Sequence, residues 1–134
     1  MDTYLINQLQ MIQNRACRII YGLRKRDSVT SYMKEIHWLK IKELIEFKVI
    51  LLVYKSQNDQ APTYLSELIQ YNSHSGSRTH NLESGSFNTR YGYRAFQVCG
   101  PKLWNALPLY IKTSQSTEIL KKRLKEFLFH KSYP

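Results

Sequence analysis

Cationic side chains are the residues whose type and spacing point most directly to a chemistry, and that chemistry is the binding of phosphates. Arg15 and Arg18 are three residues apart, so on a helix they share a face. Helix-borne cations of this kind can hold a nucleic-acid backbone. For each cationic group, the alternative is a solvated face without a ligand. The two candidate nucleic-acid-binding groups are Arg15, Arg18, Arg24, Lys25 and Arg26, and Lys121, Lys122, Arg123 and Lys125.

The overall charge supports a polyanionic partner. The 134 residues include 20 Lys and Arg against 10 Asp and Glu, which gives a net charge of +10. A field of this sign attracts nucleic acid, and counterion release would supply much of the affinity. A protein that is merely basic remains the alternative. The hydrophobic share of 43% argues against a wholly disordered chain.

Other chemistries lack the residues that they need. A zinc site takes four ligands in closely spaced pairs, and His74 and His80 have no cysteine near them. Cys17 and Cys99 form no CxxC pattern, and a packed thiol is the favoured interpretation of Cys17. There is no G-x-S-x-G motif and no phosphate-binding loop. We therefore expect no catalytic residue, no metal and no cofactor.

Cysteine content and hydropathy favour an intracellular protein, nuclear or cytoplasmic, rather than a secreted one. Two distant cysteines are no disulfide framework, and the N-terminus does not resemble a signal peptide. The longest apolar run, residues 49–54, is far shorter than the ~20 residues of a membrane-spanning helix. We therefore expect no membrane partner.

The first strong pattern is an amphipathic helix near the N-terminus. Thr3 is a candidate cap for its start and Gly22 for its end. Its opposite face includes Met11 beside Arg15 and Arg18. Steps of four and three residues separate its apolar positions, which are Leu5, Leu9, Ile12, Ala16 and Ile19.

Residues 41–57 predict the central helix, because they are apolar nearly all round from Phe47 onward. A strand is the alternative there, and the length favours a helix. Asp27 or Ser28 is expected to cap a short helix that precedes residues 41–57. Ser116 is expected to cap the last helix of the chain. Pro101 suits the first turn of another short helix, which ends before Pro108. Trp38 and Trp104 are interpreted as packing residues rather than base-stacking ones.

These elements predict a mainly α fold, a small irregular bundle of five to six helices with a long polar loop and at most a short strand. The segments are a helical one at 1–70, a flexible polar loop at 71–92 and a C-terminal helical one at 93–134. The strand, if present, falls at 87–91. The last segment is expected to pack on the first, forming one domain.

Five strings that cover most of the chain share one further property. The strings are LQMIQNRACRIIYG (9–22), IHWLKIKELIEFKVILLVYK (36–55), APTYLSELI (61–69), YGYRAFQVCGPKLWNALP (91–108) and LKKRLKEFLF (120–129). In this order they resemble one family, the LINE-type (non-LTR) retrotransposon reverse transcriptases of the jockey-like or chicken-repeat-like kind. Two departures from the family pattern fit a diverged copy: Lys40 stands where proline is usual, and residues 77–80 replace Leu-Arg-Ser-Ser.

The resemblance implies a thumb-like segment and C-terminal extension that follow the polymerase palm of an RNA-directed DNA polymerase. It implies contact with template RNA or an RNA–DNA hybrid, and with the polymerase core. Polymerase chemistry needs paired carboxylates that hold two metal ions. Asp2, Asp27 and Asp59 adjoin no other acid, so we expect no enzyme activity. The alternatives are a structural brace for that core, or a decayed transposon reading frame without function.

Overall fold

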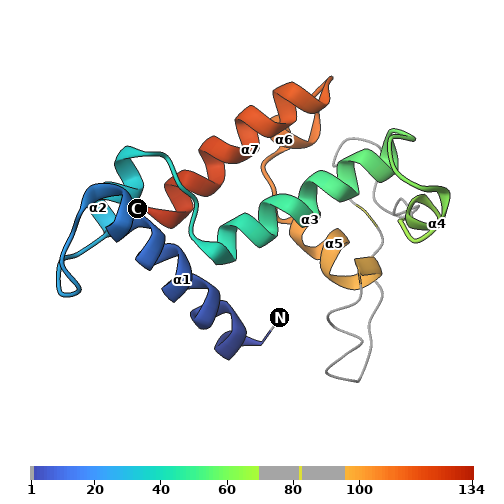
Figure 1. Ribbon diagram of the computed structural model, residues 1–134. Coiled ribbons are helices and arrows are strands. Elements are labelled where there is room, and N and C mark those ends of the chain that lie inside the picture. The colour runs from blue at the N-terminus through green and yellow to red at the C-terminus, as the bar shows by residue number, and fades with distance from the viewer. Residues whose placement is uncertain (1, 70–81, 83–95) are drawn as a thin grey trace. The chain divides into compact units, whose positions relative to one another are not determined.

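The computed structural model describes residues 2–69, 82 and 96–134 (Figure 1). Within these ranges the regular structure is helical, which confirms the predicted mainly α class. The predicted loop at 71–92 and strand at 87–91 lie outside the described residues, apart from Leu82, as do His74 and His80. In chain order the helices are α1 (Thr3–Tyr21), α2 (Thr30–Glu35), α3 (Ile41–Gln57), α4 (Thr63–Ser66), α5 (Phe96–Asn105), α6 (Leu109–Lys112) and α7 (Thr117–Ser132).

The chain divides into two compact units. Unit 1 comprises Met1–Ile45 with Lys125–Pro134, and unit 2 comprises Glu46–Leu124. Each unit therefore combines residues from the predicted segments 1–70 and 93–134.

Unit 1 has a small core in which the C-terminus of the chain meets its beginning. Cys17, Val29, Met33 and Tyr133 are buried together, and Trp38 packs against them. The Tyr133 hydroxyl donates a hydrogen bond of 2.7 Å to the Trp38 carbonyl. The buried Cys17 confirms the interpretation of a packed thiol.

The ends of α1 are set by local chemistry. Asp2, rather than Thr3, is the N-cap, and its carboxylate accepts a hydrogen bond of 3.2 Å from the Tyr4 N–H. Gly22 ends the helix in the left-handed conformation at φ 62°, as predicted. Thr3 is the first residue of the helix, because the Asp2 carboxylate one position earlier already accepts from one of the free N–H groups of the first turn.

The start of α2 differs from the prediction of an Asp27 or Ser28 cap. The N-cap position is Val29, without a side-chain hydrogen bond. The Asp27 carboxylate instead accepts from the Arg24 N–H at 2.8 Å. Asp27 therefore closes the preceding turn, while burial of Val29 holds the start of α2.

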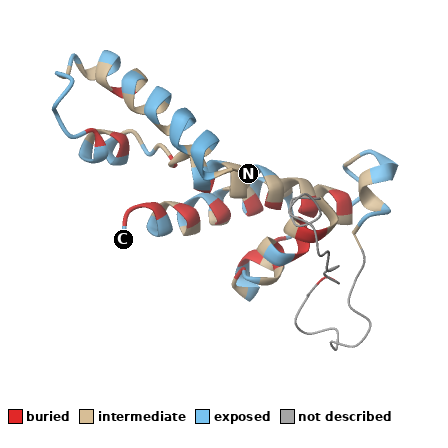
Figure 2. Cartoon of the chain, turned by 90° about the horizontal axis from the view of Figure 1, so that it is seen from below, coloured by how far each residue is buried: buried red, intermediate tan, exposed pale blue. Residues whose placement is uncertain are grey.

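The inward face of α1 is partly polar, and its apolar stripe is exposed. The Gln13 amide donates to the Leu39 carbonyl at 2.8 Å, and the Gln10 side chain accepts from the Ile41 N–H at 2.9 Å. These bonds tie α1 to the segment that enters α3. An amphipathic helix normally packs its apolar stripe on a core. Figure 2 shows exposed residues along the helix that begins at the N label. The stripe residues Leu5, Leu9, Ile12 and Ile19 are all exposed.

Unit 2 is built on α3, whose predicted bounds are confirmed. Ile50, Val53 and Tyr54 are buried, as expected of a central helix. The Tyr54 hydroxyl donates to the Ser114 carbonyl at 3.0 Å. Trp104 of α5 is 1% exposed, which confirms its packing role.

Helix α5 begins before its predicted start. It runs from Phe96, so Pro101 lies inside it rather than in its first turn. Helix α6 follows directly on Pro108, where the sequence indicated only a stop. Proline suits the position before a helix as well as the position after one, because it lacks only its own N–H.

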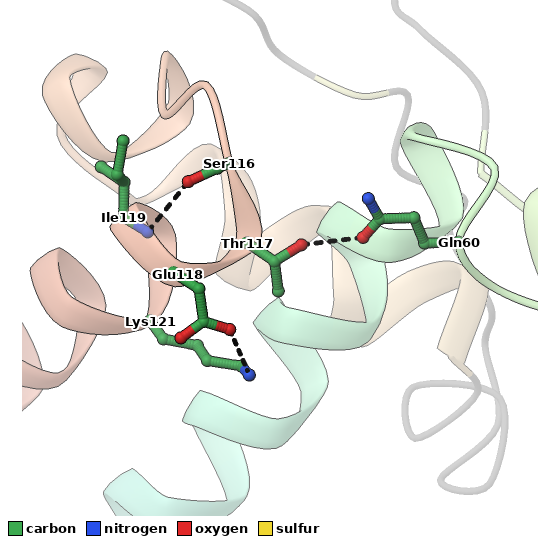
Figure 3. A network of polar contacts seen from close by, with 6 residues as sticks. All are labelled: Gln60, Ser116, Thr117, Glu118, Ile119 and Lys121. Atoms are coloured by element: carbon green, nitrogen blue, oxygen red, sulfur yellow. Dashed lines mark hydrogen bonds and ion pairs between the residues drawn. The ribbon is translucent and has the colours of Figure 1, made fainter.

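The start of α7 carries a small polar network (Figure 3). The Ser116 hydroxyl accepts from the Ile119 N–H at 3.3 Å, which confirms the predicted cap. The Thr117 hydroxyl donates to the Gln60 side-chain oxygen at 2.8 Å. Lys121 and Glu118 form an ion pair of 3.1 Å.

Candidate nucleic-acid interface

Part of the first cationic group surrounds a surface hollow on unit 1. Its volume is about 590 Å³. Arg15 and Arg18 reach it from α1, and Lys25 reaches it from the segment after the helix. The lining residues are Met11, Asn14, Arg15, Arg18, Ile19 and Lys25.

Helical spacing and one glycine turn explain this arrangement. Met11, Asn14, Arg15 and Arg18 are separated by three or four residues, so they lie along one side of α1. At Gly22 the chain reverses direction, and the Leu23 N–H bonds back to the Arg18 carbonyl at 2.9 Å. This turn allows Lys25 to reach the same hollow as Arg18.

The hollow is electropositive. Among the described residues no carboxylate lies within ion-pair distance of Arg15, Arg18 or Lys25. The Arg18 Nε is buried and has no hydrogen-bond partner in the described part of the chain. Buried donors normally have acceptors, so the Arg18 side chain that lines the hollow has an unsatisfied hydrogen-bond donor among the described residues.

Arg24 and Arg26 are exposed and do not line the hollow. They flank Lys25 in the turn that the Arg24 N–H and the Asp27 carboxylate close. The structure therefore gathers three of the five predicted cations and leaves the other two beside them.

The second cationic group is distributed around α7. Lys121 and Lys125 are one turn apart and share a side, whereas Lys122 and Arg123 are rotated by about 100° and 200° from Lys121. Lys121 is held by Glu118, and the Arg123 guanidinium donates to the Tyr110 carbonyl. Lys122 and Lys125 are exposed. Within the described part of the chain, this group therefore offers two cations without a side-chain partner, and its members share no single face.

Sequence reasoning found the cations of the hollow but not its remaining lining. Met11 was placed on the face of Arg15 and Arg18, yet its role there was not predicted. Asn14 and Ile19 were missed, although Asn14 has the same helical spacing. Nothing in the local pattern predicts the return of Lys25.

Other reactive groups are dispersed. No group of three His, Cys, Asp or Glu side chains within 2–69, 82 and 96–134 is placed to hold a metal ion. Burial raises the pKa of the half-buried Cys99 thiol and lowers the pKa of the Lys112 ammonium. No helix in the described ranges is long and apolar enough to cross a membrane.

Comparison with known proteins finds no matching family model, no matching curated protein and no matching solved structure.

Proposed function

We propose that this chain is a non-catalytic, intracellular C-terminal piece of a retrotransposon RNA-directed DNA polymerase, which contacts template RNA or an RNA–DNA hybrid through basic helices. The observation that carries the proposal is the hollow on α1, around which Arg15, Arg18 and Lys25 gather with no neutralising carboxylate among the residues that the structure describes. The five family-like strings support the parentage, and the net charge of +10 supports the class of ligand.

The geometry suits a contact that positions a strand rather than one that reads its sequence. Arginine and lysine hold phosphate oxygens through charge-assisted hydrogen bonds. Such contacts fix the register of the nucleic acid and carry no base information. Exposed Arg24 and Arg26, which flank Lys25, can add further phosphate contacts along the strand.

Salt-dependent binding tests the proposal. Fluorescence anisotropy with labelled RNA and with an RNA–DNA hybrid should give tight binding at low salt and a steep loss as salt rises. In the triple variant Arg15→Glu, Arg18→Glu, Lys25→Glu, affinity should fall at least about tenfold. The log–log salt slope should fall by about 2 to 3, since each lost phosphate contact removes roughly 0.7 to 0.9.

The matched control reverses three exposed lysines elsewhere in the chain, Lys34, Lys42 and Lys48. It changes the net charge by the same amount, so it corrects for the overall field. An equal loss of affinity in both triple variants would refute a local interface. Absence of binding to any nucleic acid at low salt would refute the proposed function.

The exposed apolar stripe of α1 favours a second candidate, a structural brace for the polymerase core. Ile12 and Ile19 are 61% and 82% exposed, and apolar surface of this kind commonly marks a protein contact. The brace predicts that the charge-reversed triple variant folds and keeps whatever nucleic-acid affinity the parent has. The triple-variant experiment therefore separates the two candidates.

A further inference from the structure

We infer that the hollow on α1 takes one unstacked nucleotide, with its base against Met11 and Ile19 and its phosphate on Arg15, Arg18 and Lys25, so that the interface prefers a single strand to a duplex. The inference rests on the proposed function and goes beyond it. Phosphate contacts alone do not distinguish single strands from duplexes, whereas a contact with the face of an unstacked base does.

The apolar part of the lining is the first argument. Met11 is 49% exposed and Ile19 is 82% exposed, although both sit among cations. A surface that held only phosphates would gain nothing from a thioether and a sec-butyl group there. Both groups offer polarisable contact to the face of a base. In a duplex that face is stacked on its neighbours, but in a single strand it is available.

The size of the hollow is the second argument. Its volume of about 590 Å³ falls within the range of roughly 300 to 1,000 Å³ that is usual for small-molecule sites. A nucleotide is a ligand of that class. The hollow lies at the surface of α1, where a continuous strand can enter and leave.

The hydrogen-bonding groups of the hollow are the third argument, because they are donors. The Asn14 side-chain oxygen already accepts from the Gln10 amide at 3.0 Å, which leaves its NH₂ group for a ligand. Arg15, Arg18 and Lys25 add cationic donors to the same lining. Donors of this kind match the phosphate oxygens and the carbonyl oxygens of a base. The same lining disfavours a cation or a positively charged peptide.

Three labelled probes test the inference with the whole chain: oligouridine, the same oligomer with abasic positions, and an RNA–DNA hybrid of equal length. Oligouridine should bind up to about tenfold more tightly than the abasic oligomer, because only oligouridine has bases that the Met11 thioether can contact. The hybrid should bind with the weaker affinity of the abasic probe. This comparison uses the unaltered protein, so folding does not enter it.

A double variant assigns the effect to the hollow. Met11→Ala with Ile19→Ala should lower oligouridine affinity by up to about tenfold and leave hybrid affinity unchanged. The matched control, Leu5→Ala with Ile12→Ala, alters two exposed apolar residues of the same helix outside the lining, and it should change neither affinity.

The outcomes are separable. Equal binding of oligouridine, abasic oligomer and hybrid would overturn the inference and leave the proposed function standing. An equal loss of oligouridine affinity in both double variants would also overturn it. No binding of any probe would overturn the inference and the proposed function together.

Discussion

Gly100 shows how one residue controls the approach of two helices in unit 2. A Cβ atom at this position would lie 2.9 Å from the Cγ2 of Val53. That distance is closer than carbon atoms can pack, so glycine permits the contact between α5 and α3. The buried Trp104 and Tyr54 side chains, with ring centroids 6.4 Å apart, join the same two helices.

Gly100→Ala should destabilise the protein by about 1 kcal/mol, because overpacking of ~1–3 kcal/mol exceeds the gain in helix propensity of ~1 kcal/mol. Urea unfolding measures the change. Adding Val53→Ala should remove part of the Gly100→Ala penalty, since it deletes the clashing atom. Gly22→Ala is the control: nothing lies within 4 Å of its Cβ, and its φ of 62° makes the substitution costly for conformational reasons alone. If Val53→Ala relieved Gly22→Ala equally, the close approach would not be the cause.

Helix α1 shows how one element can present three different surfaces. Cys17 and the Gln10 and Gln13 amides face the rest of unit 1. The basic hollow occupies a second side. The apolar stripe defined by Leu5, Leu9, Ile12, Ala16 and Ile19 occupies a third, and Ile19 lies at the border where the stripe meets the hollow. The stripe has the spacing of a coiled-coil seam, yet polar bonds to residues 39 and 41 determine which side faces inward.

Because the stripe is exposed, truncating one of its side chains should change the free energy of unfolding only slightly. Ile12→Ala should alter the free energy of unfolding by less than about 0.5 kcal/mol, as at other surface positions. Met33→Ala, in the core of the same unit, should cost about 2 to 5 kcal/mol. Urea denaturation of both variants provides the comparison. A cost for Ile12→Ala as large as that for Met33→Ala would show that the stripe is buried in solution.

At the scale of the molecule, the C-terminal residues of the chain complete unit 1. Tyr133 is buried beside Cys17, and its hydroxyl bonds to the Trp38 carbonyl. Lys40 lies over its ring, 5.2 Å from the centroid. Burial, with smaller contributions from Cys17 and Glu43, raises the pKa of the Tyr133 phenol above 10.0.

The raised pKa of Tyr133 predicts a loss of stability at alkaline pH. The folded state holds the phenolic proton more tightly than the unfolded state, whose phenol titrates near pH ~10. The contribution is therefore complete below about pH 10 and is lost as pH rises through the folded-state value. The protein should therefore unfold at a lower urea concentration above pH ~10 than below it. Urea titrations on either side of that pH measure the difference.

Tyr133→Phe removes the titrating group and isolates its effect. This variant should start about 1 kcal/mol less stable at neutral pH, for want of the hydrogen bond to Trp38, and should lose less stability as pH rises. Tyr64→Phe alters a 66% exposed tyrosine and should keep the parent's alkaline profile. A Tyr133→Phe profile that parallels the parent's would contradict the assignment.

The positions of the main helices followed from local sequence, because a helix forms its hydrogen bonds within a few residues of each donor. The bounds of α3, the Gly22 end of α1 and the Ser116 cap of α7 agreed with the patterns for that reason. The cations of the candidate site were also visible as residues spaced along one helix face.

Only the tertiary structure decided which faces point inward and which cations meet. The inward side of α1 depends on bonds from Gln10 and Gln13 to backbone more than twenty-five residues away, with sequence separations of 31 and 26. The core of unit 1 depends on Tyr133, which is separated from Trp38 by 95 residues. Local periodicity carries no information about such partners. Periodicity therefore predicted that α1 is an amphipathic helix. It did not predict that the face of Gln10 and Gln13 would point inward and that the apolar stripe would remain exposed.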